Sequence, residues 1–554
     1  MKVLGINALF HDPSAALVVD GTVVAATEEE RLSRRKHGHR PVPFAAWELP
    51  ERAARWCLAA AGLEPGDLDA VAYSYDVALA RPADELGLHD PWDHLRQTYA
   101  REAPGFLAEA LPGLDAAKVR FVPHHVAHAA SAALAAPCAA TDPATDAATD
   151  VLVLDGRGEC ASHLAGTYRG GRLEVHGTQG LPHSLGLLYE ELTEHLGFLR
   201  SSDEYKVMAL ASYGEPRFLP QLRERVRTTG DGGFVTEPVD WATLAKPLRP
   251  GEEWTGDHAD LAASVQRRLE EVLLELARHL RARTGGRRLT LAGGVALNCV
   301  ANTVLVEQSG YDEVWVQPAA GDAGTSLGGA LQLAADAGDP VAPMPGTALG
   351  RGWSDDEIEA RLQTARLPYE RPADLADEVA RCLAENGVVA WFQGRSEFGP
   401  RALGHRSLLA HPGRRENLER LNDVKGREQF RPVAPMVRLE RAGEIFSRGP
   451  LPSPYMLFVH DVDPAWRDRI PAVVHADGTA RVQTVAAEDE PLVARMLAAF
   501  EARTGLPVVV NTSLNTAGRP MVDDPRDALE CFGSAPVDLL AIGPFVVRRR
   551  GLDR

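Results

Sequence analysis

The sequence predicts a mixed α/β and α+β protein with at least two domains. Its 554 residues exceed what one hydrophobic core usually supports. A pattern of strand, turn, strand, turn and strand occurs twice in the first half of the chain, at 3–27 and 151–176. A stretch rich in Pro, Gly and Ala at 334–352 is typical of a linker. We therefore predict domains at 1–345 and 346–554.

Both copies of the three-strand pattern have the same local plan. A glycine turn precedes the third apolar run, Asp20-Gly21 in the first copy and Gly170-Gly171 in the second. Each copy opens with an apolar run that ends in a polar loop, so an internal duplication would direct two loops into a shared cleft. Two unrelated hairpins are the alternative that the pattern alone leaves open.

Glycine-rich turns follow the second copy. A helix is expected over 257–283, and a later strand runs into Gly293-Gly294, with Asn298 just beyond. Residues 321–329 form a second glycine-rich strand-to-helix turn. Backbone N–H groups of such turns can approach a phosphate, so together with the repeat they favour a nucleotide cleft like that of actin and sugar kinases. Close packing is the other use of these glycines.

Beyond the linker the sequence predicts a second mixed domain. Ser354, followed by three acidic residues at 355–357, is typical of a capped helix start. Strands are expected at 387–392 and 507–511. In the first domain, the segment 137–150 is expected to be a disordered surface loop.

Composition and charge argue against several classes of protein. A formal net charge of −18 opposes nonspecific binding to nucleic acids and anionic membranes. No apolar run approaches the roughly 18 residues that span a bilayer. The first residues lead into a strand rather than a secretory signal, so we expect a cytoplasmic protein. The 6 cysteines form no Cys-x-x-Cys pair, which argues against a disulfide framework or a thiolate zinc site.

Two histidines mark a candidate metal site. His124 and His128 are four residues apart in an Ala-rich segment that should be helical, so both rings lie on one helix face. Asp155, after a strand, and Asp322, in the second glycine-rich turn, are the candidate oxygen ligands. Such a set suits Fe(II), Mn(II) or Zn(II). A histidine pair on a helix surface and aspartates that only cap turns are the alternatives.

A third histidine is a candidate catalytic base. His11 lies in the loop of the first three-strand pattern, where a kinase-like fold directs its loop into the cleft. A histidine with a pKa near neutrality can take a proton from a hydroxyl group. The alternative is an ordinary turn, because Asp12, Pro13 and Ser14 follow.

Basic residues recur near the C-terminal end among glycines and prolines. Guanidinium groups held beside rigid Gly-Pro turns suit recognition of a triphosphate and of a second, small phosphate compound. Surface arginines paired with some of the 77 acidic residues are the alternative. The candidates are Arg401, Arg406, Lys425, Arg427, Arg431, Arg481 and Asn511.

Nine short motifs occur in order along the chain. They are Gly5-Ile6-Asn7 to His11-Asp12, Glu28 to Arg31, Pro123 to His128, Glu204 to Gly214, Gly293 to Asn298, Gly321 to Gly324, Phe398 to Gly404, Arg431 to Pro435 and Asn511 to Asn515. Over its full length the chain resembles the O-carbamoyltransferases of antibiotic biosynthesis and nodulation, the family that includes the tobramycin and cephamycin carbamoyltransferases. One departure is Ala209, where the family pattern leads us to expect glycine.

The resemblance implies two domain types. The first domain would be actin/sugar-kinase-like, a duplicated ribonuclease H-like fold of the TsaD type, and the second would be YrdC-like. The second domain would make carbamoyl adenylate from carbamoyl phosphate and ATP, with magnesium accompanying ATP, and the first would move the carbamoyl group to a hydroxyl. Adenylation supplies a good leaving group, a metal ion polarises the carbonyl, and enclosure limits hydrolysis.

The resemblance also implies roles for single residues. His11 would be the base, and Lys36, the Gly293-Gly294 turn and Asn298 would hold the carbamoyl adenylate. The metal, expected to be Fe(II) with Mn(II) or Zn(II) as alternatives, would be bound by His124, His128, Asp155 and Asp322. The phosphates would be held by Arg401, Arg406, Lys425, Arg431 and Arg481, with Asn511 and Arg519 as further contacts.

The acceptor cannot be read from the sequence. Its pocket is expected to come from loops such as 80–105 and 228–253, whose composition is compatible with a macrolide, a glycoside, an aminoglycoside or a β-lactam. Threonylcarbamoyl transfer to tRNA is a second interpretation, opposed by the negative charge. A non-catalytic ATP-binding scaffold is a third, opposed by the presence of His11 and the metal histidines. A homodimer is compatible with the resemblance, but no residue pattern fixes the oligomeric state.

Overall fold

The computed structural model describes residues 1–38, 48–138 and 148–549. The chain divides into two compact units, Met1–Gly346 and Thr347–Arg554. The sequence places the boundary between residues 345 and 346. Each unit is mixed in secondary structure. Among the helices of the described residues, none combines the length and the apolar content needed to cross a bilayer.

The first sheet of the first unit is built from the first three-strand pattern. Its order is β3-β2-β1-β4-β5, with β1 antiparallel to β2, β2 antiparallel to β3, β4 parallel to β1 and β5 parallel to β4. The apolar runs of these strands are almost wholly buried, as the sequence pattern predicts. The strands are β1 (Lys2–Asn7), β2 (Ser14–Val19), β3 (Thr22–Glu28), β4 (Ala70–Tyr73) and β5 (Val119–Phe121).

The second sheet repeats the arrangement of the first. Its order is β12-β11-β6-β7-β8, so the first three strands are again antiparallel neighbours and the last two extend the sheet in parallel. This shared order confirms the internal duplication and the predicted actin/sugar-kinase-like class, and it excludes two unrelated hairpins. The strands are β6 (Thr149–Leu154), β7 (Ala161–Arg169), β8 (Arg172–Gly180), β11 (Arg288–Ala292) and β12 (Glu313–Val316).

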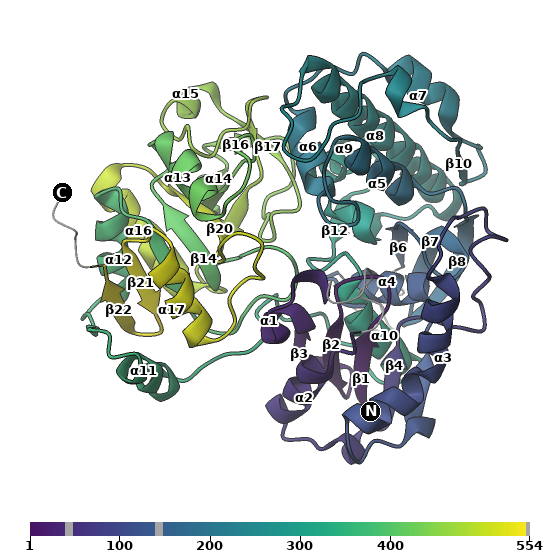
Figure 1. The fold of residues 1–554 in the computed structure, drawn as a ribbon, viewed down its shortest axis with the longest axis horizontal. Helices are drawn as coiled ribbons and strands as arrows, with labels where there is room; N and C mark the ends of the chain where they lie inside the picture. The colour runs from purple at the N-terminus through teal and green to yellow at the C-terminus, as the bar shows by residue number, and fades with distance from the viewer. Residues whose placement is uncertain (39–47, 139–147, 550–554) are drawn as a thin grey trace. The chain divides into compact units, whose positions relative to one another are not determined.

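Two helices lie between these sheets (Figure 1). Helix α10 (Ala323–Asp336) packs on β1 and β2, and α4 (His124–Ala133) packs on β6, β7 and β11, while the two helices pack on each other. A Cβ atom on Gly328 would collide with the carbonyl oxygen of Ala127, and one on Gly5 would collide with the carbonyl oxygen of Ser326. For these two glycines, close packing is therefore the observed role.

The remaining helices of this unit pack on the sheets, as α2 does on β2 and β3, or gather around α8, as α6, α7 and α9 do. The helix expected over 257–283 is present and is the longest of the described helices. A short ribbon of β9 (Val226–Thr228) and β10 (Phe234–Thr236) packs beside it. The helices are α1 (Glu29–Ser33), α2 (Glu51–Ala60), α3 (Asp93–Ala110), α5 (Leu185–His195), α6 (Glu204–Ala211), α7 (Leu219–Arg225), α8 (Gly256–Thr284) and α9 (Cys299–Gln308).

Three segments expected to be loops contain regular structure. Thr149 and Asp150, placed in the loop 137–150, are buried and begin β6, while residues 139–147 lie outside the described residues. The expected linker begins within helix α10, which ends only at Asp336. The expected acceptor loop 80–105 contains most of α3. Most of the polar residues that suggested a loop lie on the exposed face of this helix.

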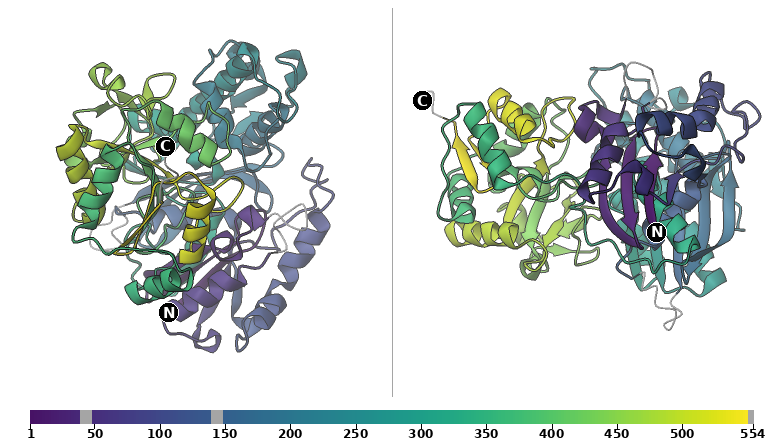
Figure 2. Two further views of the ribbon diagram at one scale, coloured as in Figure 1. Left: turned by 60° about the vertical axis from the view of Figure 1, so that its left-hand side comes forward. Right: turned by 90° about the horizontal axis from the view of Figure 1, so that it is seen from below.

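The second unit is built on a seven-stranded mixed sheet, seen from further directions in Figure 2. The order is β19-β15-β20-β14-β13-β21-β22, and both strands predicted here, at 387–392 and 507–511, lie in it. The strands are β13 (Val389–Phe392), β14 (Arg406–Ala410), β15 (Ala434–Arg438), β19 (Gln483–Val485), β20 (Val508–Ser513), β21 (Leu539–Ile542) and β22 (Phe545–Arg548).

Helices and a small sheet complete the second unit. Ser354 caps α11, accepting a hydrogen bond from the Glu357 backbone N–H at 3.3 Å, as the sequence predicts. An apolar core, with Trp391 and Phe500 almost wholly buried, joins these elements to the sheet. The elements are α11 (Asp355–Thr364), α12 (Leu375–Ala384), α13 (Glu416–Val424), α14 (Leu439–Ala442), α15 (Pro464–Arg467), α16 (Pro491–Thr504), α17 (Pro525–Ser534), β16 (Phe446–Ser447), β17 (His460–Val462) and β18 (Thr479–Ala480).

Candidate active site

The N-terminal turn of α4 places two histidines side by side. His124 and His128 are both wholly buried, and their ring centroids lie 4.7 Å apart. One oxygen of Glu159 accepts hydrogen bonds from the backbone N–H groups of His124, at 2.7 Å, and Asp76, at 2.8 Å. A buried carboxylate at a helix N-terminus satisfies free N–H groups and interacts favourably with the helix dipole. Glu159 therefore fixes the start of the helix that carries both rings.

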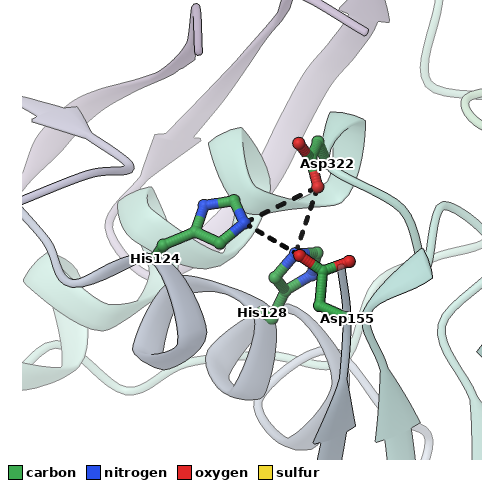
Figure 3. Close-up of side chains that lie close together, drawn as sticks. All are labelled: His124, His128, Asp155 and Asp322. Atoms are coloured by element: carbon green, nitrogen blue, oxygen red, sulfur yellow. Dashed lines mark ion pairs between the residues drawn. The ribbon is translucent and has the colours of Figure 1, made fainter. Parts of the chain in front are cut away.

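Two aspartates from separate elements complete a cluster with these rings (Figure 3). Asp155 follows β6 directly, and Asp322 immediately precedes α10. Nε2 of His124 lies 3.4 Å from Asp155 Oδ2 and 3.6 Å from Asp322 Oδ1. Nε2 of His128 lies 3.9 Å from Asp155 Oδ2 and 3.4 Å from Asp322 Oδ1. The four residues predicted as metal ligands thus converge on one point.

The donor atoms of this cluster fit a divalent cation. Nε2 of His124, Nε2 of His128 and Oδ1 of Asp322 are buried, and within the described residues they have no hydrogen-bond partner. Buried polar atoms without partners are costly, and a shared cation would satisfy all three. The other nitrogen of His124, Nδ1, lies 3.2 Å from the Ser74 carbonyl oxygen, a contact that orients metal-binding imidazoles. Two nitrogens and two oxygens suit Fe(II), Mn(II) or Zn(II).

Both aspartates of the cluster are held in the ionised form. Burial by itself raises the pKa of Asp322, but the charges of His11 and His124 outweigh it and lower that pKa to about 2. Burial likewise opposes ionisation of Asp155, but the neighbouring imidazoles of His124 and His128 outweigh it and hold its pKa well below the usual range. Charged carboxylates are the oxygen ligands that divalent metals prefer.

The candidate base lies beside this cluster. His11 is in the loop between β1 and β2, and its Nε2 is 3.7 Å from Asp322 Oδ2. Its Nδ1 is 3.0 Å from Asp12 Oδ2. The side chain of His11 is 28% exposed, so a small molecule can reach it. The loop of the first three-strand pattern is therefore directed at the four-residue cluster, as the sequence predicts.

The predicted adenylate-binding residues do not all face the four-residue cluster. Gly293 follows β11 with a left-handed φ of 91°, and Gly294 N–H donates to Asp155 Oδ1 at 2.9 Å, so this turn lies against the cluster. Lys36 begins the single turn Lys36–Gly38. Asn298 instead caps α9 and exchanges hydrogen bonds of 2.8 and 3.1 Å with Gln266. Because both ends of its amide are engaged within the protein, this geometry favours a helix cap over a nucleotide contact.

Arg406 is the predicted phosphate ligand whose surroundings differ most from that role. Its side chain is wholly buried, and the guanidinium lies 3.7 Å from the centroid of the Phe392 ring. Its terminal nitrogens donate to backbone carbonyls at 2.7 to 3.2 Å, so the side chain ties the strand ends together rather than facing a ligand. The four carbonyls belong to Arg351, Gln393, Gly394 and His405.

Lys425 and Asn511 also make internal contacts. Lys425 Nζ donates to the Ser513 carbonyl and hydroxyl oxygens, both at 2.7 Å, and to Asn515. Asn511 donates to the Ala402 carbonyl oxygen at 2.9 Å and to Gln483 at 2.7 Å, while its Oδ1 has no hydrogen-bond partner in the described part of the chain. Asn511 thus connects β20 to the loop at 398–404, and Lys425 connects the end of α13 to the end of β20.

The other basic candidates differ in exposure. Arg401, in the loop at 398–404, and Arg481, between β18 and β19, are partly buried. Arg431 is 17% exposed and lies 3.4 Å from Glu428. Arg519 is 61% exposed and pairs with Glu530 on α17. Arg427 donates to the Asn422 side chain. Of the phosphate ligands that the resemblance implies, Arg401, Arg431 and Arg481 are therefore the partly buried ones.

Sequence reasoning missed two carboxylates that support these sites. Glu159 holds the start of α4, as described above. Glu397 is buried in the second unit, where one oxygen accepts hydrogen bonds from the backbone N–H groups of Leu403, His405 and Arg406 at 2.8 to 3.0 Å. Neither stands in a spaced pattern with other ligands. No signal in the sequence marks either of them, because the N–H groups that they accept from come together only in the fold.

These observations define an α/β protein whose duplicated, actin-like unit carries a buried cluster of two histidines and two aspartates beside a histidine loop. The family model for the carbamoyltransferase N-terminus matches residues 2–113 and 108–331, and that for the carbamoyltransferase C-terminus matches residues 380–549. The chain belongs to the carbamoyltransferase family. The resemblance drawn from the nine motifs is confirmed, and the activity supported is that of a carbamoyl-transferring enzyme.

Similar proteins span most of the chain. Nodulation protein NolNO of Sinorhizobium fredii is 37% identical over 98% of this chain and 80% of its own length. The uncharacterized protein sll1178 of Synechocystis sp. is 36% identical over 99% of this chain and 96% of its own length. Among solved structures, the activator of the 2-hydroxyisocaproyl-CoA dehydratase from Clostridium difficile, with bound ADPNP, is 12% identical over 61% of this chain and 95% of its own, with a TM-score of 0.31.

Proposed function

We propose that this carbamoyltransferase is ATP-dependent and acts on a hydroxyl group of a small natural product. The second unit would form carbamoyl adenylate from carbamoyl phosphate and ATP, and the first would transfer the carbamoyl group. The observation that carries the proposal is the convergence of His124, His128, Asp155 and Asp322, with His11 Nε2 3.7 Å from Asp322. A buried cation site beside a reachable imidazole suits polarisation of a carbonyl and removal of a proton from an alcohol.

The proposed first half-reaction takes place in the YrdC-like unit. Carbamoyl phosphate, ATP and water yield carbamoyl adenylate, pyrophosphate and phosphate, with magnesium accompanying ATP. Arg401, Arg431 and Arg481 are the proposed phosphate ligands. A guanidinium group can donate two hydrogen bonds to the oxygens of one phosphate, and these three side chains are partly buried. Arg406, Lys425 and Asn511 would support the surrounding loops and strand ends through their internal hydrogen bonds.

The proposed second half-reaction takes place in the first unit. His11 Nε2 would accept the proton of the acceptor hydroxyl while the hydroxyl oxygen bonds to the carbamoyl carbon and the bond from that carbon to AMP breaks. Lys36 and the turn at Gly293-Gly294 would hold the adenylate. When bound by the four-residue cluster, a divalent metal, expected to be Fe(II), would supply Lewis acidity toward the carbonyl oxygen.

The proposal is tested first without an acceptor. Purified protein with ATP, magnesium and labelled carbamoyl phosphate should release pyrophosphate, and AMP as the adenylate hydrolyses. Arg431→Ala should lower pyrophosphate release by about 100-fold, because a charge-assisted phosphate contact is lost. Arg526→Ala, on the 78%-exposed Arg526 of α17, is the matched control and should behave as the wild type.

A panel comprising a macrolide, a glycoside and an aminoglycoside would then be screened for carbamate ester formation. No pyrophosphate from iron-loaded wild-type protein, with or without the panel, would contradict ATP dependence and favour the scaffold interpretation. Equal release by wild type and Arg431→Ala would remove Arg431 from the phosphate site.

A further inference from the structure

The histidine loop contains a second carboxylate to which the proposed function gives no role. Resting on that proposed function, we propose that Asp12 is a positioning residue for His11. His37 shares the Asp12 carboxylate from its other side, so that a hydrogen-bonded chain runs from His37 through Asp12 to His11. The sequence alone explains Asp12 as an ordinary turn residue, and the geometry points beyond that.

The two oxygens of Asp12 contact two different imidazoles. Oδ2 is 3.0 Å from His11 Nδ1, and Oδ1 is 2.7 Å from His37 Nδ1. The opposite nitrogen of His11, Nε2, is 3.7 Å from Asp322 Oδ2. The ring of His11 is therefore held at Nδ1 by Asp12, while Nε2 faces the four-residue cluster, where the reacting groups would lie.

The backbone around this chain is in an uncommon conformation. Phe10, Asp12 and His37 have φ values of 60°, 51° and 55°, in the left-handed region that non-glycine residues seldom adopt. The side-chain amide of Asn7 donates to the carbonyl oxygens of His11 and Asp12, both at 3.0 Å, and holds the loop in this shape. Strained backbone of this kind concentrates at functional sites, because surrounding contacts must impose it.

A carboxylate at Nδ1 has a definite consequence for an imidazole base. When Nδ1–H donates to Asp12, the neutral ring keeps its lone pair on Nε2, which is the tautomer that can accept a proton. The negative charge also favours the imidazolium that forms when Nε2 takes that proton. Asp12 would thus select the productive tautomer and ring orientation of His11 without contacting the substrate.

A cation site is the other use that these groups suggest. Asp12, Glu30 and His37 offer ligand atoms within 4.8 Å of one another. However, the His37 backbone N–H already donates to Glu30 Oε2 at 2.8 Å, and the contact from His37 to Asp12 has hydrogen-bond length. Hydrogen bonds thus account for the group without an ion. Glu30 also fixes the turn that contains Lys36, so the proposed adenylate contact and the chain to His11 share one short segment.

Asp12→Asn is the first test, made on the full-length, iron-loaded protein. Asparagine tolerates the left-handed backbone, but its amide nitrogen cannot accept a hydrogen bond, so it cannot serve both rings. We expect kcat for carbamoyl transfer to the best alcohol of the panel to fall by about 100-fold. The KM for that alcohol, pyrophosphate release and iron bound per chain should stay unchanged. Asp20→Asn is the matched control, because Asp20 also has a left-handed φ of 48° but is 82% exposed in a turn.

His37 provides the second test. His37→Ala removes the partner of Asp12 Oδ1, and we expect kcat to fall by about tenfold. His37→Gln keeps a side-chain N–H that can donate to Asp12, and it should recover most of the wild-type kcat. A turn that matters only for folding would not distinguish alanine from glutamine in this way.

The outcomes separate this inference from the proposed function. Wild-type kcat in Asp12→Asn would overturn the positioning role, as would a parallel loss of kcat, alcohol binding and iron, which would mark a merely structural residue. Failure of the proposed function would instead appear as the absence of pyrophosphate release in the wild-type protein.

Discussion

At the residue scale, the predicted ligands and base lie together because one helix, the ends of two other elements and one loop meet at the same place. His124 and His128 share a helix face, Asp155 follows a strand, and Asp322 precedes a helix. Local periodicity and strand ends are what a sequence displays most clearly. Helices α4 and α10 pack on each other between the two sheets, and this packing brings the separate segments together in one site.

The metal-binding role makes a prediction at this scale. His124→Ala should lower iron affinity by more than about 100-fold, because loss of a direct ligand exceeds the cost of losing an outer partner. His125→Ala is the control: His125 is the next residue, and burial lowers its pKa to about 3, so it is a neutral, buried ring outside the cluster. Iron per chain is measured after anaerobic loading and dialysis. Equal iron in both variants and the wild type would remove the cluster as the metal site.

Other residue roles could not be predicted from the sequence, because they depend on tertiary partners. Arg406 is an arginine in a Gly-Pro-rich motif, which favours a phosphate contact, yet four backbone carbonyls surround its terminal nitrogens. Asn298 follows a glycine turn but pairs with Gln266, which is distant in sequence. His37 and Glu159 have no spacing signal at all. A charged or amide side chain reveals its chemistry in the sequence but not its partner.

At the element scale, the loop after β13 is shaped by one buried carboxylate. Burial opposes ionisation of Glu397, but the charges of His405 and Arg406, with the backbone hydrogen bonds of Leu403 and Arg406, outweigh it and lower its pKa. Its ionised form therefore stabilises the folded loop that carries Arg401. The glycine and proline residues of this segment predicted a rigid turn, but not the carboxylate that organises it.

Glu397→Gln tests this role. Glutamine can still accept the three N–H bonds but loses the charge, so the free energy of unfolding should fall by about 1–3 kcal/mol at pH 7. Because the folded-state pKa is below the ordinary value of 4.5, the deficit relative to wild type should persist down to about pH 5 and shrink as the pH falls through the folded-state pKa. Urea unfolding midpoints between pH 7 and pH 3 measure it. Glu385→Gln, at a 63%-exposed surface ion pair, should change little, and an equal deficit there would contradict the account.

At the scale of the whole molecule, the duplication could be predicted and the boundaries of several segments could not. The three-strand pattern is local and occurs twice, so it identifies both sheets before any contact is known. The order of the later strands depends on long-range pairing, such as β11 with β6, which no local pattern specifies. The acceptor pocket could not be predicted either. Helix α3 stands where a loop was expected, and the residue types on its polar face do not identify a ligand.

The most direct test of the account separates the two half-reactions in one protein. The wild-type protein and His11→Gln would be incubated with ATP, magnesium, carbon-13-labelled carbamoyl phosphate and the best alcohol of the panel. Pyrophosphate and the labelled carbamate ester would be measured in parallel. We predict that both proteins release pyrophosphate and that only the wild type forms the ester at an appreciable rate. Ester formation by His11→Gln at the wild-type rate, or no pyrophosphate from either protein, would contradict the central claim.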